Sequence, residues 1–195
     1  TTMKDLVSRG SNPDATHLIY NGIDWPALKR ARSLNQQYDV IFVGRLAHMK
    51  NVSLLVRSVG ILVKNFPAIK VCIVGGGPEE KNLKSLSISL GVEKNMTFVG
   101  EVKNLEKVYS YMKSSKMFVH TSLWEGFGIV VIEANGCGIP VITTNRRLNA
   151  SAELIRANGR VVDDTPESKA EAIDTLLTNE RKRTEMGKDA YKFAQ

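Results

Sequence analysis

The sequence has 195 residues, 43% of them hydrophobic and 24% charged, and it contains two cysteines. These values indicate one soluble globular domain and argue against a disulfide-stapled scaffold, and no apolar run approaches the ~20 residues of a membrane span. The formal net charge of +7 is compatible with binding to a phosphorylated ligand, an anionic membrane or nucleic acid. The cations are dispersed, however, and do not alternate with aromatic residues as they do in proteins that bind single-stranded nucleic acid.

The first 36 residues predict three short elements separated by turns. We expect a helix over 2–9, a strand over 16–20 and a basic helix over 26–36. The turns between these elements contain Gly10 and Gly22, and glycine favours reversal of the chain. This part of the sequence leads into a longer repeating pattern.

From residue 39 onward, β-branched apolar runs alternate with segments of helical length. The runs predict strands over 39–43, 69–74, 96–99, 117–120, 140–143 and 160–162. Helices are expected over 52–65, 79–90, 105–114, 128–137, 150–157, 166–177 and 180–194. Such alternation is typical of parallel sheets covered on both faces, and right-handed crossovers make these sheets doubly wound. The sequence therefore predicts an α/β protein with a doubly wound, Rossmann-like parallel sheet of about six strands and helices on both faces.

The loop after the first predicted strand carries two cations. Gly44 lets the backbone turn, and Arg45 and Lys50 follow it at the sheet edge where α/β proteins bind ligands. A guanidinium fork and an ammonium point charge suit a pyrophosphate, and Asn51 is placed to cap the next helix. The alternative is that both cations are solvated loop residues.

The loop after the second predicted strand is rich in glycine. Three glycines, 75–77, precede Pro78, which we expect at the first position of the next helix. Such glycines permit close approach of the backbone either to a ligand or to a neighbouring loop. The dinucleotide fingerprint needs another glycine where Glu80 stands, so the pattern supports NAD only weakly. The loop over 100–103 lies at the same edge and would offer an apolar surface to a nucleobase.

The stretch over 125–133 combines two carboxylates with a predicted helix start. Free backbone N–H groups over 126–129 would form an anion cradle, strengthened by the helix dipole. Glu125 and Glu133 flank this cradle at most about 12 Å apart, which suits a ligand with a phosphate between two hydroxylated ends. A retaining glycosidase would need its carboxyl groups ~5 Å apart. The alternative is that Glu125 is a solvated loop residue and Glu133 an exposed helix residue.

The remaining reactive side chains form no recognisable catalytic pattern. The three histidines show no metal-ligand spacing, and His120, at the end of the fourth predicted strand, is interpreted as a structural residue. No Ser/His/Asp or Cys/His arrangement is indicated. Cys72 and Cys137 are expected to be free thiols in a reducing compartment.

Seven short motifs occur in a fixed order along the chain. They are Asn21-Gly22-Ile23-Asp24, Val43-Gly44-Arg45-Leu46 with Lys50, Ile73-Val74-Gly75-x-Gly77-Pro78, Phe98-x-Gly100, Glu125-Gly126-Phe127-Gly128…Glu133-Ala134, Gly138-x-Pro140-Val141 and Glu153-Leu154-Ile155. Each motif is weak alone, but the ordered set resembles the C-terminal, donor-binding domain of the retaining glycosyltransferases of the two-domain GT-B fold, family 4 (glycosyl transferases group 1). The resemblance covers nearly the whole chain. It implies that 1–14 is the end of an N-terminal acceptor domain and that 15–195 is a nucleotide-sugar-binding, Rossmann-like domain.

The resemblance implies a role for each residue that matches the family's motifs. Arg45 and Lys50 would neutralise the donor's diphosphate and its departing charge. Glu125 would hold hydroxyl groups of the transferred sugar, and Glu133, the second glutamate of the E-x7-E motif, would bind the ribose. Further donor contacts are implied for Gly44, Gly75, Val102, Gly126, Phe127, Gly128 and Ile129. No metal and no cofactor besides the donor substrate are expected, because two cations take the place of a metal.

The resemblance implies the retaining, metal-independent transfer of a hexose from a UDP- or GDP-sugar to an unidentified acceptor. We expect this chain to bind donor without catalysing transfer, because the acceptor domain is missing. The parent enzyme is expected in the cytoplasm, with peripheral attachment to the cytoplasmic membrane left open and without nucleic acid as a partner. Gly76 and His120 depart from the family pattern, where an acidic residue and a proline are frequent, and both changes are expected to be tolerated.

Three other functions remain open from the sequence. The chain would then be half of a sugar-nucleotide epimerase with the same two-domain architecture, a nicotinamide-dependent oxidoreductase domain, or a non-catalytic module for nucleotides or nucleic acid.

Overall fold

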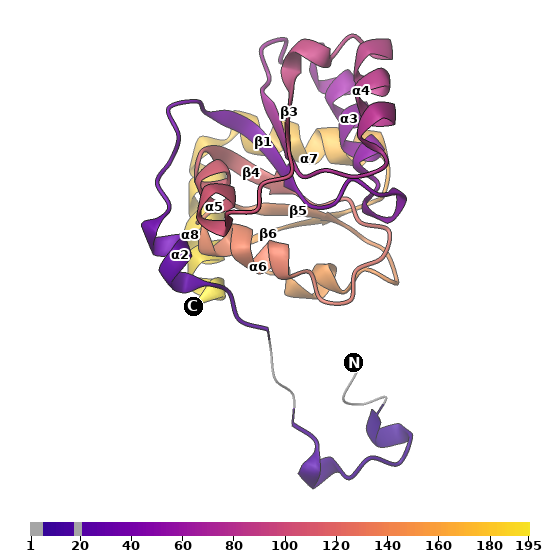
Figure 1. Cartoon of the computed structure of the whole chain (residues 1–195), viewed down its shortest axis with the longest axis vertical. Coiled ribbons are helices and arrows are strands. Elements are labelled where there is room, and N and C mark those ends of the chain that lie inside the picture. Colours follow the sequence, from indigo (N-terminus) through magenta and orange to yellow (C-terminus); the bar gives the residue numbers. More distant parts are fainter. Residues whose placement is uncertain (1–5, 18–20) are drawn as a thin grey trace.

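The computed structural model describes residues 6–17 and 21–195, and its body is a six-stranded sheet with helices on both faces (Figure 1). The strands are β1 Tyr38–Val43, β2 Val71–Val74, β3 Met96–Gly100, β4 Ser115–Val119, β5 Val141–Thr144 and β6 Gly159–Val162. They lie in the order β3-β2-β1-β4-β5-β6, and every pairing is parallel. The predicted doubly wound, Rossmann-like α/β fold is confirmed.

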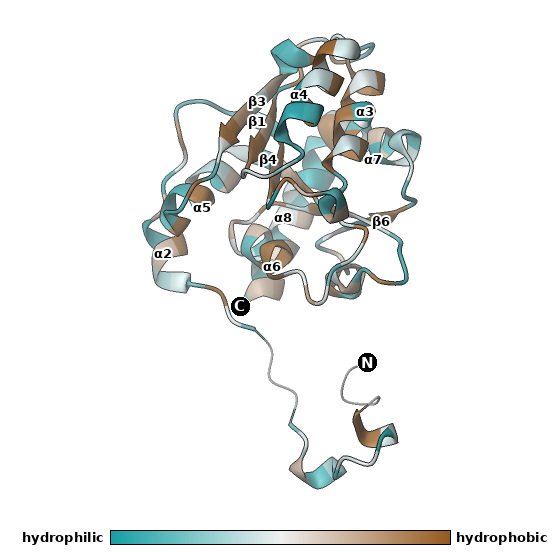
Figure 2. Cartoon of the chain, turned by 45° about the vertical axis from the view of Figure 1, so that its right-hand side comes forward, coloured by the Kyte–Doolittle hydropathy of each residue, from teal (hydrophilic) through white to brown (hydrophobic). Residues whose placement is uncertain are grey.

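The sheet separates two hydrophobic cores, one on each face. Along β1, Val40 and Phe42 belong to one core and Ile41 to the other, because successive side chains of a strand point to opposite faces. All four residues of β2 are buried, which explains why this strand is a continuous apolar run. Figure 2 shows β1 and β4 as hydrophobic strands, whereas helices such as α3 and α4 combine hydrophobic and hydrophilic segments.

The helices cover both cores in a doubly wound arrangement (Figure 1). The face that contains Val40 is covered by α3 Val52–Leu62, α4 Glu80–Ser89 and α7 Pro166–Thr178. The opposite face is covered by α2 Trp25–Arg30, α5 Leu105–Lys113 and α6 Ile129–Gly136. The last helix, α8 Glu180–Ala194, packs against α6 and α7. No helix among residues 6–17 and 21–195 is both long enough and apolar enough to cross a membrane.

Two predicted helices are shorter than expected, one because of a tertiary contact and the other because of a local turn. The helix expected over 26–36 ends at Arg30, because the Nζ of Lys113 donates to the carbonyl groups of Leu28 and Ala31 at 2.7 and 3.0 Å and draws the chain onto the end of α5. The helix expected over 150–157 is only a 3-10 segment, Ala150–Leu154. The side chain of Asn158 ends it by donating to the Leu154 carbonyl and accepting from the Arg156 N–H, at 3.0 and 2.5 Å.

Two predictions of helix starts were wrong. Pro78 is not the first residue of α4, which begins at Glu80, because the N–H of Glu79 donates to the Leu46 carbonyl at 2.9 Å and holds a turn there. Asn51 stands at the start of α3, but its backbone is left-handed with φ 46°, and its side chain accepts from the Ser53 hydroxyl rather than from a backbone N–H.

The predictions for the N-terminal segment fall partly outside the described residues. Of the helix expected over 2–9, residues 6–8 are helical. Of the strand expected over 16–20, residues 16 and 17 are described, and they do not belong to a strand. Both cysteines are free thiols, as predicted.

A lysine lies in the interior of the domain. Lys169 of α7 is fully buried, and its ammonium group has no hydrogen-bond partner in the part of the chain that the structure describes. Burial lowers the pKa of Lys169 from its ordinary value of 10.5 to about 7, against the opposing attraction of Asp164. The Asp164 carboxylate is shared with Arg146, with which it forms an ion pair. Burying the protonated lysine therefore costs stability.

We expect Lys169→Met to stabilise the domain by about 1–4 kcal/mol at pH 6. The unfolded lysine releases its proton near pH 10.5 and the folded one near pH 7, so the unfolded state binds more protons between these values and stability rises with pH there. The advantage of the variant should therefore shrink by pH 10. Urea unfolding at both pH values measures it, with Lys188→Met on the exposed surface of α8 as the control. An advantage of equal size at both pH values would contradict the prediction.

Candidate functional site

The loops at the carboxyl edge of the sheet surround the boundary between β1 and β4. The chain winds outward from β1 in one direction and from β4 in the other, so the strand order reverses at this boundary. In open α/β sheets, ligands bind in the crevice that such a reversal creates. The loops that meet there follow β1, β2, β3 and β4.

A pocket of about 510 Å³ opens where the first three of these loops meet. It is lined by Val43, Gly44, Arg45, Val74, Gly75, Gly76, Gly77, Glu101, Val102 and Val108. Four predicted donor-site residues are thereby brought together, namely Gly44, Arg45, Gly75 and Val102. The Arg45 side chain is exposed and forms no ion pair with any described carboxylate. The volume is in the range of small-molecule sites.

The glycines of the β2 loop bring two loops into contact. A Cβ atom on Gly75 would lie 1.9 Å from the carbonyl oxygen of Gly44, and one on Gly77 would lie 2.4 Å from that of Leu46. The N–H of Leu46 donates to the Gly76 carbonyl at 2.9 Å. Of the two uses predicted for these glycines, the structure shows close approach to the neighbouring loop, which forms one wall of the pocket.

The β1 and β4 loops are joined by an ion pair. The Nζ of Lys50 lies 2.6 Å from Oε2 of Glu125, and the two side chains are 23% and 17% exposed. The hydroxyl of Thr121 donates to the Lys50 carbonyl at 2.6 Å, and the N–H of Leu123 donates to the Met49 carbonyl at 2.8 Å. Lys50 and Glu125, 75 positions apart in the sequence, therefore share one polar centre.

Glu125 is ionised in this setting and held in a fixed position. Hydrogen bonding to His120, opposed by burial and assisted by Lys50, lowers the pKa of Glu125 to about 2. Its backbone is pinned on both sides, because its N–H donates to the Leu148 carbonyl and its carbonyl accepts from the Ala150 N–H, at 2.9 and 3.0 Å. The solvated loop residue that formed the alternative is not what the structure shows.

The start of α6 lies directly after Glu125. Gly128 occupies the left-handed region with φ 84°, and no side chain caps the helix. Gly126 and Ile129 are exposed and Phe127 is half-buried. The N–H of Val131 donates to the Gly128 carbonyl at 2.9 Å, whereas the N–H groups over 126–129 precede the hydrogen-bonded turns of the helix and are available to a ligand.

Glu133 lies one turn further along α6 and faces α5. The hydroxyl of Tyr109 donates to Oε1 of Glu133 at 3.0 Å, and burial raises the pKa of the carboxyl group. The neighbouring residue of α5, Val108, lines the 510 Å³ pocket. Glu133 itself does not line this pocket, but it is partly buried against α5, in contrast to the exposed helix residue of the alternative.

Sequence reasoning missed two members of the site. Tyr109, which holds Glu133, reads in the sequence as a core aromatic of an amphipathic helix. His120 was predicted to be structural and is indeed buried, but its Nε2 also lies 3.4 Å from Oε2 of Glu125. The pairing of Tyr109 with Glu133 joins two helices and has no local signal, whereas His120 and Glu125 lie five positions apart in the loop after β4.

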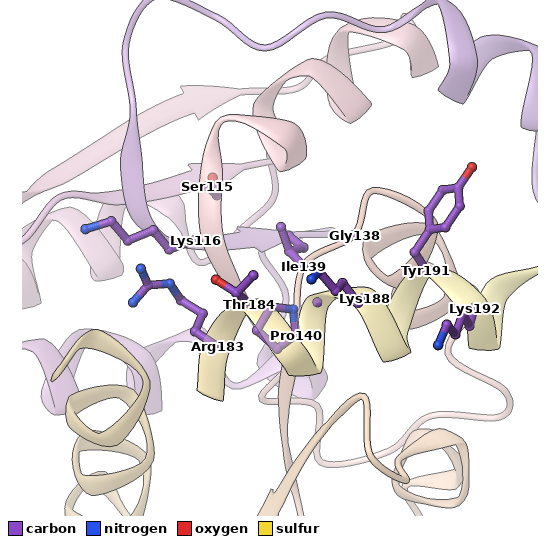
Figure 3. Close-up of a pocket in the computed structure, with 11 residues that line it drawn as sticks. Ser115, Lys116, Gly138, Ile139, Pro140, Arg183, Thr184, Lys188, Tyr191 and Lys192 are labelled. Atoms are coloured by element: carbon purple, nitrogen blue, oxygen red, sulfur yellow. The ribbon is translucent and has the colours of Figure 1, made fainter. Parts of the chain in front are cut away.

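A larger cavity of about 570 Å³ lies at the opposite edge of the sheet (Figure 3). It runs along α8 beside Ser115, the first residue of β4, and beside 138–140, which precede β5. Lys188 and Lys192 of α8 flank it. Because this groove lies at the amino ends of the strands, it is not part of the switch-point site. No cluster of three or more metal-binding side chains occurs among the described residues.

The fold and the site define a Rossmann-like α/β domain with a pocket at its switch point. The sequence profile of the glycosyl transferases group 1 family matches residues 26–193. The chain belongs to this family.

Individual proteins agree with this assignment. An uncharacterized glycosyltransferase of Methanocaldococcus jannaschii is 32% identical over 184 residues, which cover 85% of this chain and 46% of that protein. The D-inositol 3-phosphate glycosyltransferase of Paenarthrobacter aurescens is 30% identical, and the match covers 98% of this chain and 50% of that protein. The chain therefore spans about half the length of these relatives.

A solved structure shares the fold. The Anabaena protein HepE, crystallised with UDP, superposes with a TM-score of 0.82 over 99% of this chain and 56% of its own, at 22% identity. The similarity extends to the arrangement of the sheet and helices, in agreement with the predicted half of a GT-B fold.

Substitution by alanine should affect stability differently at two glycines of the site. A Cβ atom on Gly128 would lie 2.7 Å from Cβ of Ser151 and would occupy left-handed backbone, whereas Gly126 has no neighbour within 4 Å and no positive φ. We expect Gly128→Ala to lower the melting temperature by about 4 °C or more, and Gly126→Ala to change stability by less than ~0.5 kcal/mol. Differential scanning calorimetry of both variants measures this. Equal melting temperatures would show that α6 begins differently.

Proposed function

We propose that this chain is the donor-binding domain of a retaining, metal-independent glycosyltransferase that takes a hexose from a UDP- or GDP-sugar. The observation that carries the proposal is the convergence of Lys50, Glu125 and the uncapped start of α6 at one edge of the sheet. An ammonium group and free N–H groups suit phosphate oxygens, and an ionised carboxylate suits sugar hydroxyls. These are the two chemistries of a sugar diphosphate.

The nucleoside of the donor would occupy the 510 Å³ pocket. Val102 and the backbone of the β3 loop would lie against the base. The ribose would lie at Glu133, where Tyr109 holds one carboxylate oxygen and leaves the other to accept from a hydroxyl group. Burial of this carboxylate makes its hydrogen bonds stronger than bonds made in bulk water.

The diphosphate and the sugar would extend from the pocket toward the loop of β4. Lys50 would exchange Glu125 for a phosphate oxygen, and Arg45 would approach from the pocket wall. The N–H groups over 126–129 would complete the phosphate site, and the sugar hydroxyls would then meet Glu125.

Most of the catalytic effect in the complete enzyme would come from stabilising the leaving group. When the bond between the anomeric carbon and the phosphate oxygen breaks, negative charge develops on the nucleoside diphosphate. Arg45, Lys50 and the amides of α6 would lie where this charge appears, so they would favour the transition state over the bound donor. With two cations present, the proposal requires no metal ion.

Related structures favour uridine over guanosine as the base. HepE, which shares this fold, has been crystallised with UDP and with UDP-glucose. We extend this preference to the present chain and propose UDP as its nucleotide.

A second domain would complete the enzyme. Trp124 and Leu148 flank Glu125 and are 53% and 62% exposed, and such apolar side chains beside a polar centre suit a covering surface. We propose that an N-terminal acceptor domain, of which residues 1–14 are the end, covers them. The parent enzyme would work in the cytoplasm, with or without peripheral attachment to the membrane, and the chain alone would bind donor without transferring sugar.

Calorimetric titration of the chain with UDP, GDP and ADP tests the proposal. We expect UDP to bind most tightly, and binding of none of the three would overturn the proposed function. Transfer of sugar by the chain alone would contradict the need for a second domain.

Lys50→Ala should weaken UDP binding by about tenfold or more, because it removes a hydrogen bond between charged groups. Uridine lacks phosphate, so its affinity should change little. Isothermal titration with both ligands gives the comparison. Lys64→Ala, an exposed lysine beyond the end of α3, is the matched control. Equal losses for UDP and uridine would show that Lys50 is structural.

Glu133→Ala should weaken UDP binding by roughly five- to thirtyfold, because the ribose hydroxyls lose a charged acceptor. Tyr109→Phe, which keeps the ring and removes only the hydroxyl that holds Glu133, should have a smaller effect. The same titration measures both. If Glu133→Ala binds UDP as the unsubstituted chain does, the ribose lies elsewhere.

A further inference from the structure

His120 directly follows β4, and its buried ring has four polar contacts. It is 1% exposed, and both ring nitrogens have partners. Nδ1 lies 3.2 Å from the Thr143 hydroxyl and 3.0 Å from that of Ser151, while Nε2 lies 3.0 Å from the Ser122 hydroxyl and 3.4 Å from Oε2 of Glu125. A neutral imidazole offers one donor and one acceptor, so the partners decide which nitrogen carries the proton.

The partners select the tautomer with the proton on Nε2. An ionised carboxylate only accepts, so the contact with Glu125 requires a donor at Nε2. Nδ1 must then accept, and Ser151 already donates its hydroxyl proton to Oδ1 of Asn149 at 2.5 Å. The donor to Nδ1 is therefore the Thr143 hydroxyl. Burial also lowers the pKa of His120, which keeps the ring neutral.

We propose that His120 is a positioning residue that holds the carboxylate of Glu125 in place when Lys50 leaves it for a bound diphosphate. Lys50 and His120 approach the same oxygen, Oε2 of Glu125. If Lys50 turns to phosphate, His120 is the side chain that still donates to this oxygen. The inference rests on the proposed function, because it assigns the carboxylate to sugar hydroxyls.

The ring of His120 also links Glu125 to the start of α6. Ser151, which contacts Nδ1, is the residue against which Gly128 packs, and a Cβ on Gly128 would lie 2.7 Å from its Cβ. The Thr143 partner lies on β5, in the interior of the sheet. The Glu125 carboxylate, His120 and Ser151 thus belong to one buried polar cluster.

Nuclear magnetic resonance of the chain without ligand tests the tautomer. Nitrogen-15 shifts and couplings of the His120 ring should show the proton on Nε2 near neutral pH. A proton on Nδ1, with Nε2 accepting from Ser122, would overturn the inference. This result does not depend on whether the chain binds a nucleotide sugar.

The positioning role is tested by the sugar-dependent part of donor affinity. We expect His120→Phe to weaken UDP-glucose binding by about five- to twentyfold and to change UDP binding by less than about twofold. His120→Gln, whose amide nitrogen can donate to Glu125, should restore most of the loss. Calorimetric titration with both ligands gives the ratio of their dissociation constants. A ratio unchanged in His120→Phe, or a glutamine variant as weak as the phenylalanine variant, would show that the ring is only structural.

A second variant tests the same role in case the His120→Phe protein does not fold. Thr143→Val removes the donor to Nδ1 and keeps the shape of the side chain, so it should shift the same ratio in the same direction by a smaller factor. No shift in a folded Thr143→Val protein would overturn the inference. If the unsubstituted chain binds neither UDP nor UDP-glucose, the proposed function itself fails, a result distinct from the loss of the sugar-dependent ratio alone.

Discussion

The ion pair between Lys50 and Glu125 is the interaction on which the organisation of the site depends. It joins the loops of two adjacent strands at the point where the strand order reverses. A half-buried ion pair contributes little net stability, because desolvation offsets the Coulomb attraction. Its value lies in position: each charge holds the other where, under the proposed function, a ligand would replace it. A ligand that carries both anionic oxygens and hydroxyl groups can satisfy both partners at once, whereas a plain anion would satisfy only Lys50 and leave Glu125 with its charge half-buried.

The backbone around this pair is fixed by glycines whose neighbours leave no room for a side chain. Gly75 and Gly77 press the β2 loop against the β1 loop that carries the cations, and Gly128 presses the start of α6 against Ser151. These contacts lie between loops rather than between a loop and a ligand. Loops packed in this way lose little further freedom when a ligand binds, so more of the interaction energy is available for affinity. The glycines therefore prepare the pocket by shaping its walls.

The sequence predicted the fold well because the sheet is built from local signals. Continuous apolar runs such as β2 are buried on both faces, and the helices between them carry one apolar side, so each element is visible in its own residues. The misplaced ends have causes that apolar periodicity does not reveal: Lys113, from far along the chain, ends α2, and Asn158, in a local turn, ends the segment after Ala150. The same limit applies to the site. Arg45, Lys50 and Glu125 follow strands and could be placed at one edge. The pairing of Tyr109 with Glu133 depends on which helices become neighbours in space, and that of His120 with Glu125 depends on how the loop after β4 folds.

The electrostatics of the site depend on how much water surrounds it. Lys50 and Glu125 retain 23% and 17% exposure, and charges in contact with water interact far more weakly than charges in a protein interior. Under the proposed function, leaving-group stabilisation by Lys50 and Arg45 would therefore be limited while this edge of the sheet is open. The exposed apolar side chains beside the pair, Trp124 and Leu148, are the residues from which a covering surface would exclude water at least cost. Under the proposed function, closure by a second domain would thus bring the acceptor and also strengthen the interactions of the charges that this chain already holds in place. His120 is already buried, so the strength of its hydrogen bond to Glu125 would change least.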